Sequence, residues 1–219
     1  MESSAGSFYW YDLETTGIDP KHDRVVQFAG LRTDLNLEPV EKPFVTYVRL
    51  APEILPSIEA TLITGITPVR TEQGASEWQA LSEINDRFSA AGTCVTGYNN
   101  IRFDDEFIRY GLYRNLLDPY GREWRDGNSR WDLIDLVRAA GALRPDGLEW
   151  PSRDGTPVFS LEQMARANKL QHENAHDALS DVEATLSLAR AIKSRQPELY
   201  AYALTLRQKN TIGELLLPL

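Results

Sequence analysis

The sequence lacks most of what a secreted or membrane protein needs: it has one cysteine and no long apolar run in 219 residues. The single thiol, Cys94, cannot form a disulfide within the chain, which favours a reducing cytoplasm. A membrane span needs about 18 consecutive apolar residues. The first residues, MESSAGS, also lack the charged and apolar regions of a signal peptide. We therefore expect a cytoplasmic protein with no membrane partner.

Positive charge is scarce as well, since 23 Lys and Arg residues face 32 Asp and Glu residues and leave a net charge of −9. Affinity for phosphate comes from Lys and Arg, so this balance argues mildly against a nucleic-acid binder. Net charge averages over the whole surface, however, and metal-binding acids would inflate the negative count. The hydrophobic content of 42% and the length fit one large domain, or one domain with an appended element.

Turn residues separate three β-rich runs, Phe8–Glu14, Val25–Asp34 and Phe44–Leu50, and the short spacing suggests an antiparallel meander. A helix is predicted over Ser76–Ala91, followed by a strand over Thr93–Asn99. The apolar stripe of that helix should comprise Trp78, Leu81, Ile84 and Phe88. Further helices are expected near Asp104–Leu116, Leu133–Leu143, Leu161–Asn168, Asp177–Ser194 and Glu198–Gln208. This order predicts an α/β fold with a mixed sheet flanked by helices.

Two acids end the first predicted strand, in the stretch FYWYDLETTG. Residues two apart share a face of a strand, so Asp12 and Glu14 extend the apolar row of Phe8 and Trp10. The strand end could simply emerge into solvent, with both acids hydrated. Two carboxylates on one face otherwise repel each other unless a cation lies between them. Mg²⁺ or Mn²⁺ is the natural candidate, because both ions prefer oxygen ligands.

A second pair of acids, Asp104 and Asp105, opens the next predicted helix, in GYNNIRFDDEF. Acids at this position often do no more than complement the helix dipole. Phe103 and Phe107 are four residues apart and can anchor one face of the helix in the core. Asp104 should lie at the edge of that buried face and Asp105 should point further out. Asp104 is therefore the favoured ligand.

A third acid, Asp181, lies near the start of the helix predicted over Asp177–Ser194. The apolar stripe of this helix comprises Ala178, Val182, Ala189 and Ile192, with Leu186 beside it. Asp181 adjoins Val182 and can reach a site in front of the sheet. His176 is five residues earlier, about 140° away around a helix, so it should approach from the loop or first turn. His22 and His172 are interpreted as surface residues.

Taken in order, D-x-E-T-T-G at Asp12–Gly17, N-x-x-F-D at Asn100–Asp104 and H-x-x-x-x-D at His176–Asp181 resemble the three motifs of the DEDDh exonucleases. The chain resembles the exodeoxyribonuclease I subgroup of that superfamily more closely, from about Phe8 to its C-terminus. Five segments carry this second resemblance: Leu62–Pro68, Gly97–Glu106, Asn128–Ala139, Leu143–Pro151 and Asn174–Thr185.

The resemblance implies a ribonuclease-H-like fold with a mixed, mostly five-stranded sheet, two Mg²⁺ ions with Mn²⁺ as a substitute, and 3′→5′ removal of mononucleotides from single-stranded DNA. By resemblance, the ligands are Asp12, Glu14, Asp104 and Asp181, and His176 is the general base. The exonuclease domain is expected over residues 8–195, after a disordered tail over 1–7. Residues 196–219 should form a C-terminal helix and tail leading to domains absent from this chain.

The same resemblance assigns substrate contacts. Glu14, Thr15 and Thr16 are expected to hold the terminal nucleotide, and the further predicted contacts are Asn100, Phe103, Arg109, Trp124, Arg138 and Ser160. Arginines along a groove with an aromatic ring for base stacking would suit single-stranded DNA. Ser160 departs from relatives that carry an arginine there. The expected partners are the 3′ ends of single-stranded DNA, with a single-stranded-DNA-binding protein as a candidate, and the chain is expected to be monomeric.

Two alternatives remain open at this point. The first is a 3′→5′ exonuclease that acts on RNA or proofreads. The second is a nucleic-acid-binding module without catalytic activity, against which the complete ligand set argues.

Overall fold

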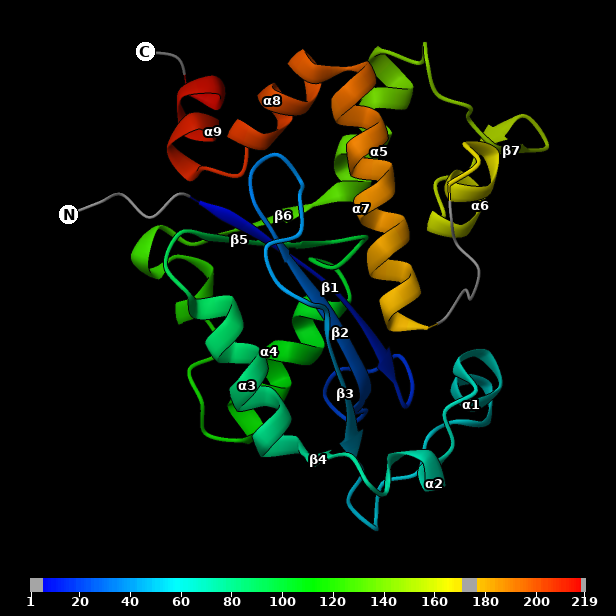
Figure 1. The fold of residues 1–219 in the computed structure, drawn as a ribbon, viewed down its shortest axis with the longest axis vertical. Coiled ribbons are helices and arrows are strands. Elements are labelled where there is room, and N and C mark those ends of the chain that lie inside the picture. Colours follow the sequence, from blue (N-terminus) through cyan, green and yellow to red (C-terminus); the bar gives the residue numbers. More distant parts are fainter. Residues whose placement is uncertain (1–5, 171–176, 218–219) are drawn as a thin grey trace.

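The computed structural model describes residues 6–170 and 177–217, which form a six-stranded mixed sheet between two layers of helices (Figure 1). The strands are β1 (Ser7–Thr15), β2 (Val25–Thr33), β3 (Phe44–Arg49), β4 (Ala75–Ser76), β5 (Thr93–Gly97) and β6 (Ser129–Asp132), and β7 (Ser152–Arg153) and β8 (Thr156–Pro157) form a separate hairpin. The helices are α1 (Ile58–Thr64), α2 (Pro68–Thr71), α3 (Glu77–Ser89), α4 (Asp104–Arg114), α5 (Leu133–Leu143), α6 (Leu161–Ala167), α7 (Ala178–Arg195), α8 (Pro197–Thr205) and α9 (Lys209–Leu216), with short 3₁₀ turns at Gly121–Glu123 and Arg125–Gly127. Ser7, the last residue of the predicted tail, already begins β1, and residues 1–5 lie outside the described residues.

The strand order is β4-β3-β2-β1-β5-β6. The predicted antiparallel meander is confirmed, because β1 pairs antiparallel with β2 and β2 with β3. Parallel pairing of β5 with β1 and of β6 with β5 makes the sheet mixed, as expected. The strand over Ser129–Asp132 and the two-residue β4 bring the total to six, where mostly five were expected. Central β1 is thus buried between neighbours on both sides.

Alternation along β1 sends its side chains into two separate cores. Phe8 and Trp10 pack in the core beneath α5, α7 and α8, whereas Tyr9 and Tyr11 pack in the core beneath α3 and α4. Figure 1 shows α7 along one side of the sheet and α3 and α4 on the other. Asp12 is two residues beyond Trp10, so it faces α7. The predicted face of β1 is therefore confirmed.

The stripe predicted for α7 is also confirmed, since Ala178, Val182, Leu186, Ala189 and Ile192 are all buried in the first core. Helix α7 contacts both β1 and β2. This packing places the first turn of α7, with Asp181, against the strand that carries Asp12 and Glu14.

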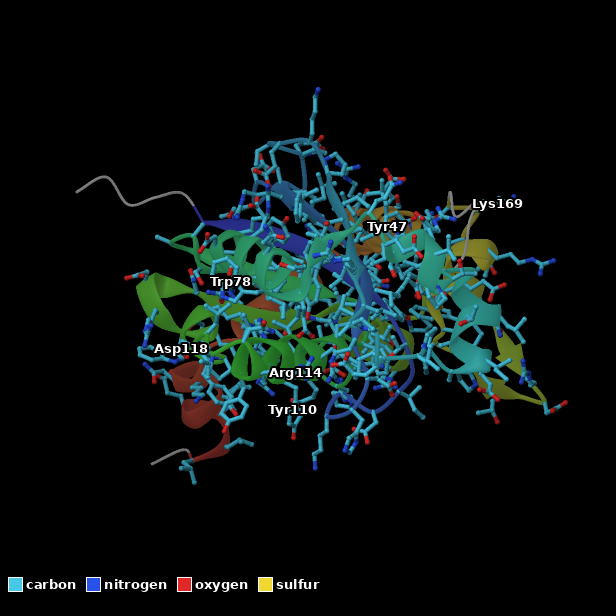
Figure 2. All side chains as sticks on the ribbon, turned by 90° about the horizontal axis from the view of Figure 1, so that it is seen from below. Tyr47, Trp78, Tyr110, Arg114, Asp118 and Lys169 are labelled. Carbon is cyan, nitrogen blue, oxygen red and sulfur yellow. The ribbon has the colours of Figure 1, made fainter. Side chains whose placement is uncertain are left out.

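The stripe predicted for α3 was wrong in one position. Leu81, Ile84 and Phe88 are buried, but Trp78, labelled in Figure 2, is 55% exposed. Each helical residue advances about 100°, so residues three apart drift by about 60°, and Trp78 falls off the face that the other three share. Ala80 completes the buried face instead.

A close approach of β5 to β1 depends on Gly97. A Cβ atom there would lie 2.6 Å from the backbone oxygen of Tyr11, a distance that real Cβ atoms essentially never show. Because Gly97 ends β5, the following loop and the start of α4 come close to the end of β1.

Within the described residues, the structure contains no helix of the length and apolarity that a membrane crossing requires.

Candidate active site

Three carboxylates meet where β1 ends. Ligand oxygens of Asp12, Glu14 and Asp181 all lie within 4.8 Å of one another. Glu14 is buried, and Asp12 and Asp181 are partly buried. The alternative in which the strand end emerges into solvent is thus not what the structure shows, because these acids lie between β1 and α7.

Asp104 approaches the same place from the start of α4 and is 4% exposed. The backbone of Leu13, the residue between Asp12 and Glu14, lies close enough to lower the pKa of Asp104. Asp104 lies outside the group of three oxygens within 4.8 Å, yet among the charged groups it has the largest effect on Asp12. We call Asp12, Glu14, Asp104 and Asp181 the acid cluster.

The electrostatics of the acid cluster favour a bound cation. Burial raises the pKa of Asp12 well above its usual value, and the charge of Asp104 raises it further. Burial also raises the pKa of Glu14 to about 8, with Asp181 as the next cause. The pKa of Asp104 is raised by burial too, although backbone hydrogen bonds offset part of the rise. A hard divalent cation would remove this mutual repulsion, and a set of carboxylate oxygens fits such an ion.

Asp105 contradicts the prediction that it points outward. It is fully buried and accepts a hydrogen bond from the hydroxyl of Tyr11 at 2.9 Å. It forms ion pairs with Arg122 at 3.0 Å and Arg130 at 2.7 Å. Burial by itself would raise its pKa, but the two arginines outweigh burial and hold the pKa below its usual value. The 3₁₀ turn and β6 supply these arginines, which helical periodicity alone could not reveal.

His176 lies outside the described residues. Its neighbour Asp177 is described, and the sequence interpretation gave it no role beyond the start of the helix. Asp177 is the N-cap of α7, where its side chain accepts a hydrogen bond from the backbone of Ser180. Its charge also raises the pKa of Asp12 and Glu14. An aspartate directly before a helical stripe is an N-cap signal, so this residue could have been found from the sequence.

The side chains of Thr15 and Thr16, two predicted substrate contacts beside the acid cluster, already form hydrogen bonds within the protein. Thr15 donates its hydroxyl hydrogen to the backbone oxygen of Gly17 at 2.7 Å. The fully buried Thr16 donates to Asp23 at 2.8 Å and accepts from the backbone of Arg24 at 2.9 Å. These bonds hold the turn after β1, so the Thr16 side chain is committed to the fold.

Asn100 and Phe103 lie in the loop between β5 and α4. The side chain of Asn100 is fully buried, and neither its oxygen nor its nitrogen has a hydrogen-bond partner among the described residues. The Phe103 ring packs on Phe107, with ring centroids 5.0 Å apart. Asn100 thus keeps a free donor and a free acceptor within this part of the structure.

The remaining predicted contacts lie outside the acid cluster. Arg109 forms ion pairs with Glu106 and with Glu123, the latter at 2.9 Å. Trp124 is 64% exposed. Arg138 is exposed on α5, and Ser160 is exposed at the start of α6.

Tyrosine side chains surround Arg109, and the sequence interpretation missed them. The guanidinium of Arg109 lies 5.5 Å from the ring centroid of Tyr120. Both residues line a cavity of about 290 Å³ together with Tyr110 and Tyr113. A helix with tyrosines at 110 and 113, followed by a third in DPYGREW, was the available signal.

A mixed sheet flanked by helices, with acids gathered at the end of its central strand, defines a ribonuclease-H-like nuclease fold. The family model described as "Exonuclease" matches residues 9–189. The chain belongs to this exonuclease family, and within it to the DEDDh exonucleases of the exodeoxyribonuclease I type.

The exodeoxyribonuclease I relatives that match this chain are longer than it. The chain is 48% identical to exodeoxyribonuclease I of Haemophilus influenzae over 211 residues, which is 95% of this chain and 45% of that protein. It resembles the structure of exonuclease I from Methylocaldum szegediense at 52% identity and a TM-score of 0.93, covering 96% of this chain and 45% of the other. The Escherichia coli exonuclease I complex with a dA16 oligonucleotide gives a TM-score of 0.94 at 44% identity, with the same coverage. The chain therefore spans about half the length of these relatives.

Proposed function

We propose that this chain is the catalytic domain of a 3′→5′ exonuclease that releases nucleoside 5′-monophosphates from single-stranded DNA. The acid cluster is the observation that carries the proposal, because buried and mutually repelling carboxylates are suited to divalent ions. The similarity to exonuclease I in complex with a DNA oligonucleotide supports the substrate.

Asp12, Glu14, Asp104 and Asp181 are the proposed ligands of two Mg²⁺ ions, for which Mn²⁺ would substitute. Such a pair of ions lowers the pKa of a bound water and stabilises charge on a phosphate. The charges of all three other acids raise the pKa of Asp12, so Asp12 is the ligand that we propose the ions would share. β1, α4 and α7 bring these four carboxylates to one place, so the protein itself would supply oxygen ligands in fixed positions.

Other residues would bind and orient the strand. His176 remains the proposed general base, since an unperturbed histidine has a pKa near 6.5. The hydroxyls of Thr15 and Thr16 already bond within the protein, and so do the backbone nitrogen and oxygen of Thr16, so both residues would act by shaping the turn beside the terminal nucleotide. Asn100 offers an unused amide, Phe103 a ring beside the acid cluster, and Ser160 an uncharged hydroxyl.

The outer contacts form a second group. Arg109, Trp124 and Arg138 are proposed to contact the strand further from its 3′ end, by charge and by base stacking. A monomeric state, a cytoplasmic location and binding to a single-stranded-DNA-binding protein also remain proposals. Light scattering of the purified chain would test the first of these.

The proposal is tested with a 5′-labelled single strand and the purified chain in Mg²⁺. We expect stepwise shortening from the 3′ end with release of mononucleotides. A strand with a blocked 3′ end, EDTA, and an Asp12→Asn variant should each prevent it. Faster degradation of a matched RNA strand would support the RNA alternative. Binding of both strands without cleavage would instead indicate a module without catalytic activity.

A further inference from the structure

Gln27 of β2 lies directly opposite Glu14 of β1 in the antiparallel register. Directly opposed residues share a face of the sheet, so the side chain of Gln27 lies on the same face as Glu14. It is 2% exposed. A buried glutamine must satisfy a carbonyl oxygen and an amide nitrogen, because leaving either unpaired in the interior is costly.

The partners of Gln27 come from the start of α7. Its Nε2 lies 3.4 Å from Oδ2 of Asp177 and donates to it. Its Oε1 accepts from the backbone nitrogen of Ala178, also at 3.4 Å. Asp177 uses its other oxygen to cap the helix at Ser180. One amide of β2 therefore bonds both the N-cap side chain and the first backbone nitrogen of α7.

A third contact of the Gln27 amide comes from the neighbouring strand β3. Its Nε2 also lies 3.4 Å from the hydroxyl of Tyr47 on β3, a residue labelled in Figure 2. That hydroxyl accepts a hydrogen bond from Arg70 at 2.9 Å. The amide is thus held between the sheet and α7.

The position matters because Asp181 follows one turn after Asp177. Its carboxylate must come from α7 to meet Asp12 and Glu14, which come from β1. The two strands β1 and β2 form one rigid surface, and Gln27 fastens the start of α7 to that surface beside Glu14. Groups that hold metal ligands in place typically change metal affinity or activity by about 10–100-fold when they are removed.

We propose that Gln27 is a positioning residue of the acid cluster: it fixes the start of α7 and so keeps Asp181 within reach of a cation shared with Asp12 and Glu14. This inference rests on the proposed function where its test measures exonuclease activity. Its metal-binding measurement does not require turnover.

The first test compares two variants that loosen α7 at different ends. Gln27→Met removes the amide at similar volume. The matched control is Arg190→Met, because Arg190 bonds the backbone oxygen of Leu37 at 3.0 Å from the far part of the same helix. Arg190 is nine residues beyond Asp181, or about 14 Å along a helix.

We expect Gln27→Met to lower kcat and to raise the dissociation constant for Mn²⁺, each by about 10-fold or more. The KM for the oligonucleotide should change little. Arg190→Met should leave kcat and Mn²⁺ affinity within about 2-fold of the original chain, although both variants lower Tm. The two are compared at a temperature where circular dichroism shows both to be folded.

The second test restores the hydrogen bond with its direction reversed. Gln27→Glu alone places a carboxylate against Asp177 and should lower Mn²⁺ affinity and kcat at least as much as Gln27→Met. Adding Asp177→Asn lets the amide at position 177 donate to the new carboxylate at position 27, and asparagine remains a good N-cap. The double variant should recover most of the lost kcat, which is a coupling that a double-mutant cycle measures.

The outcomes separate the two claims. Equal effects of Gln27→Met and Arg190→Met, or a double variant no better than Gln27→Glu, would overturn the positioning role. If the chain binds Mn²⁺ but does not degrade DNA, the proposed function fails while the affinity comparison still decides the role of Gln27. A chain that binds no Mn²⁺ overturns both.

Discussion

Asp104 and Asp105 are consecutive residues, both buried, in opposite electrostatic surroundings. Asp104 belongs to the acid cluster, and its pKa is raised by burial and by the charges of Asp105 and Asp132. Asp105 belongs to an ion-pair network comprising Asp105, Arg109, Arg122, Glu123 and Arg130. There the arginines lower its pKa despite full burial.

The difference separates two uses of a buried carboxylate. In the ion-pair network the protein supplies the opposite charge, so removing one partner leaves another charge buried and unpaired. In the acid cluster the protein gathers negative charge, and the compensating charge must come from solution. The ion-pair network therefore stabilises the fold, whereas the acid cluster is suited to bind cations.

The largest expected effect is at Asp12, whose pKa is raised by the charges of all three other acids of the cluster. Asp12→Asn should lower the rate of mononucleotide release by about 1,000-fold or more, because a metal-bound transition state loses its shared ligand. In EDTA the same variant should be at least as stable as the original chain, because a repelling charge is gone. Activity assays and thermal denaturation check both parts. A fully active variant would remove Asp12 from the proposed ligands.

The same substitution at the two adjacent positions should give opposite results. Asp105→Asn should cost about 3–5 kcal/mol of folding stability, because Arg122 and Arg130 lose their buried partner. Asp104→Asn should lower activity by about 100-fold or more with little loss of stability. Denaturant unfolding and activity assays, run on both variants below their Tm, check this pair. Equal stability losses would contradict the distinction drawn between the two regions.

Divalent cations should stabilise the chain through the acid cluster alone. Ions that bind only the folded state at about 100 times their dissociation constant add about 2.7 kcal/mol. We therefore expect Mg²⁺ to raise Tm in the original chain and in Arg190→Met, but not in Asp12→Asn. Differential scanning fluorimetry with and without EDTA measures the shift. A Tm rise of the same size in Asp12→Asn would place the responsible ions elsewhere.

The smallest expected effect concerns the outer contacts. Arg138→Ala should raise KM for a single-stranded oligonucleotide by about 3–10-fold, and leave kcat nearly unchanged, because one phosphate contact is lost. The slope of log KM against log salt concentration should also decrease by about one, because one fewer counterion is released on binding. Steady-state kinetics over a salt series checks this. A fall in kcat with unchanged KM would count against a binding role.

Much of the acid cluster could be predicted from the sequence, because it depends on local periodicity. Alternation along β1 predicted the shared face of Asp12 and Glu14. The helical stripe of α7 predicted that Asp181 would face the sheet. The same reasoning was wrong at Trp78, where a repeat of three was taken for the helical period.

The rest depended on contacts between distant segments. Asp105 is paired with Arg122 and Arg130, 17 and 25 residues away, and with Tyr11, 94 residues away. Gln27 meets Asp177 across 150 residues. No pattern within either segment indicates such a partner.

By itself, then, the sequence determined which acids share the faces of β1 and α7, because side-chain direction follows the backbone period. The tertiary structure decided which buried acids are paired with arginines and which are left to repel one another. The physical reason is that the free energy of a buried charge depends on the nearest opposite charge in space. Asp104 and Asp105 are adjacent in the chain, but Asp104 lies in the acid cluster and Asp105 is paired with Arg122 and Arg130.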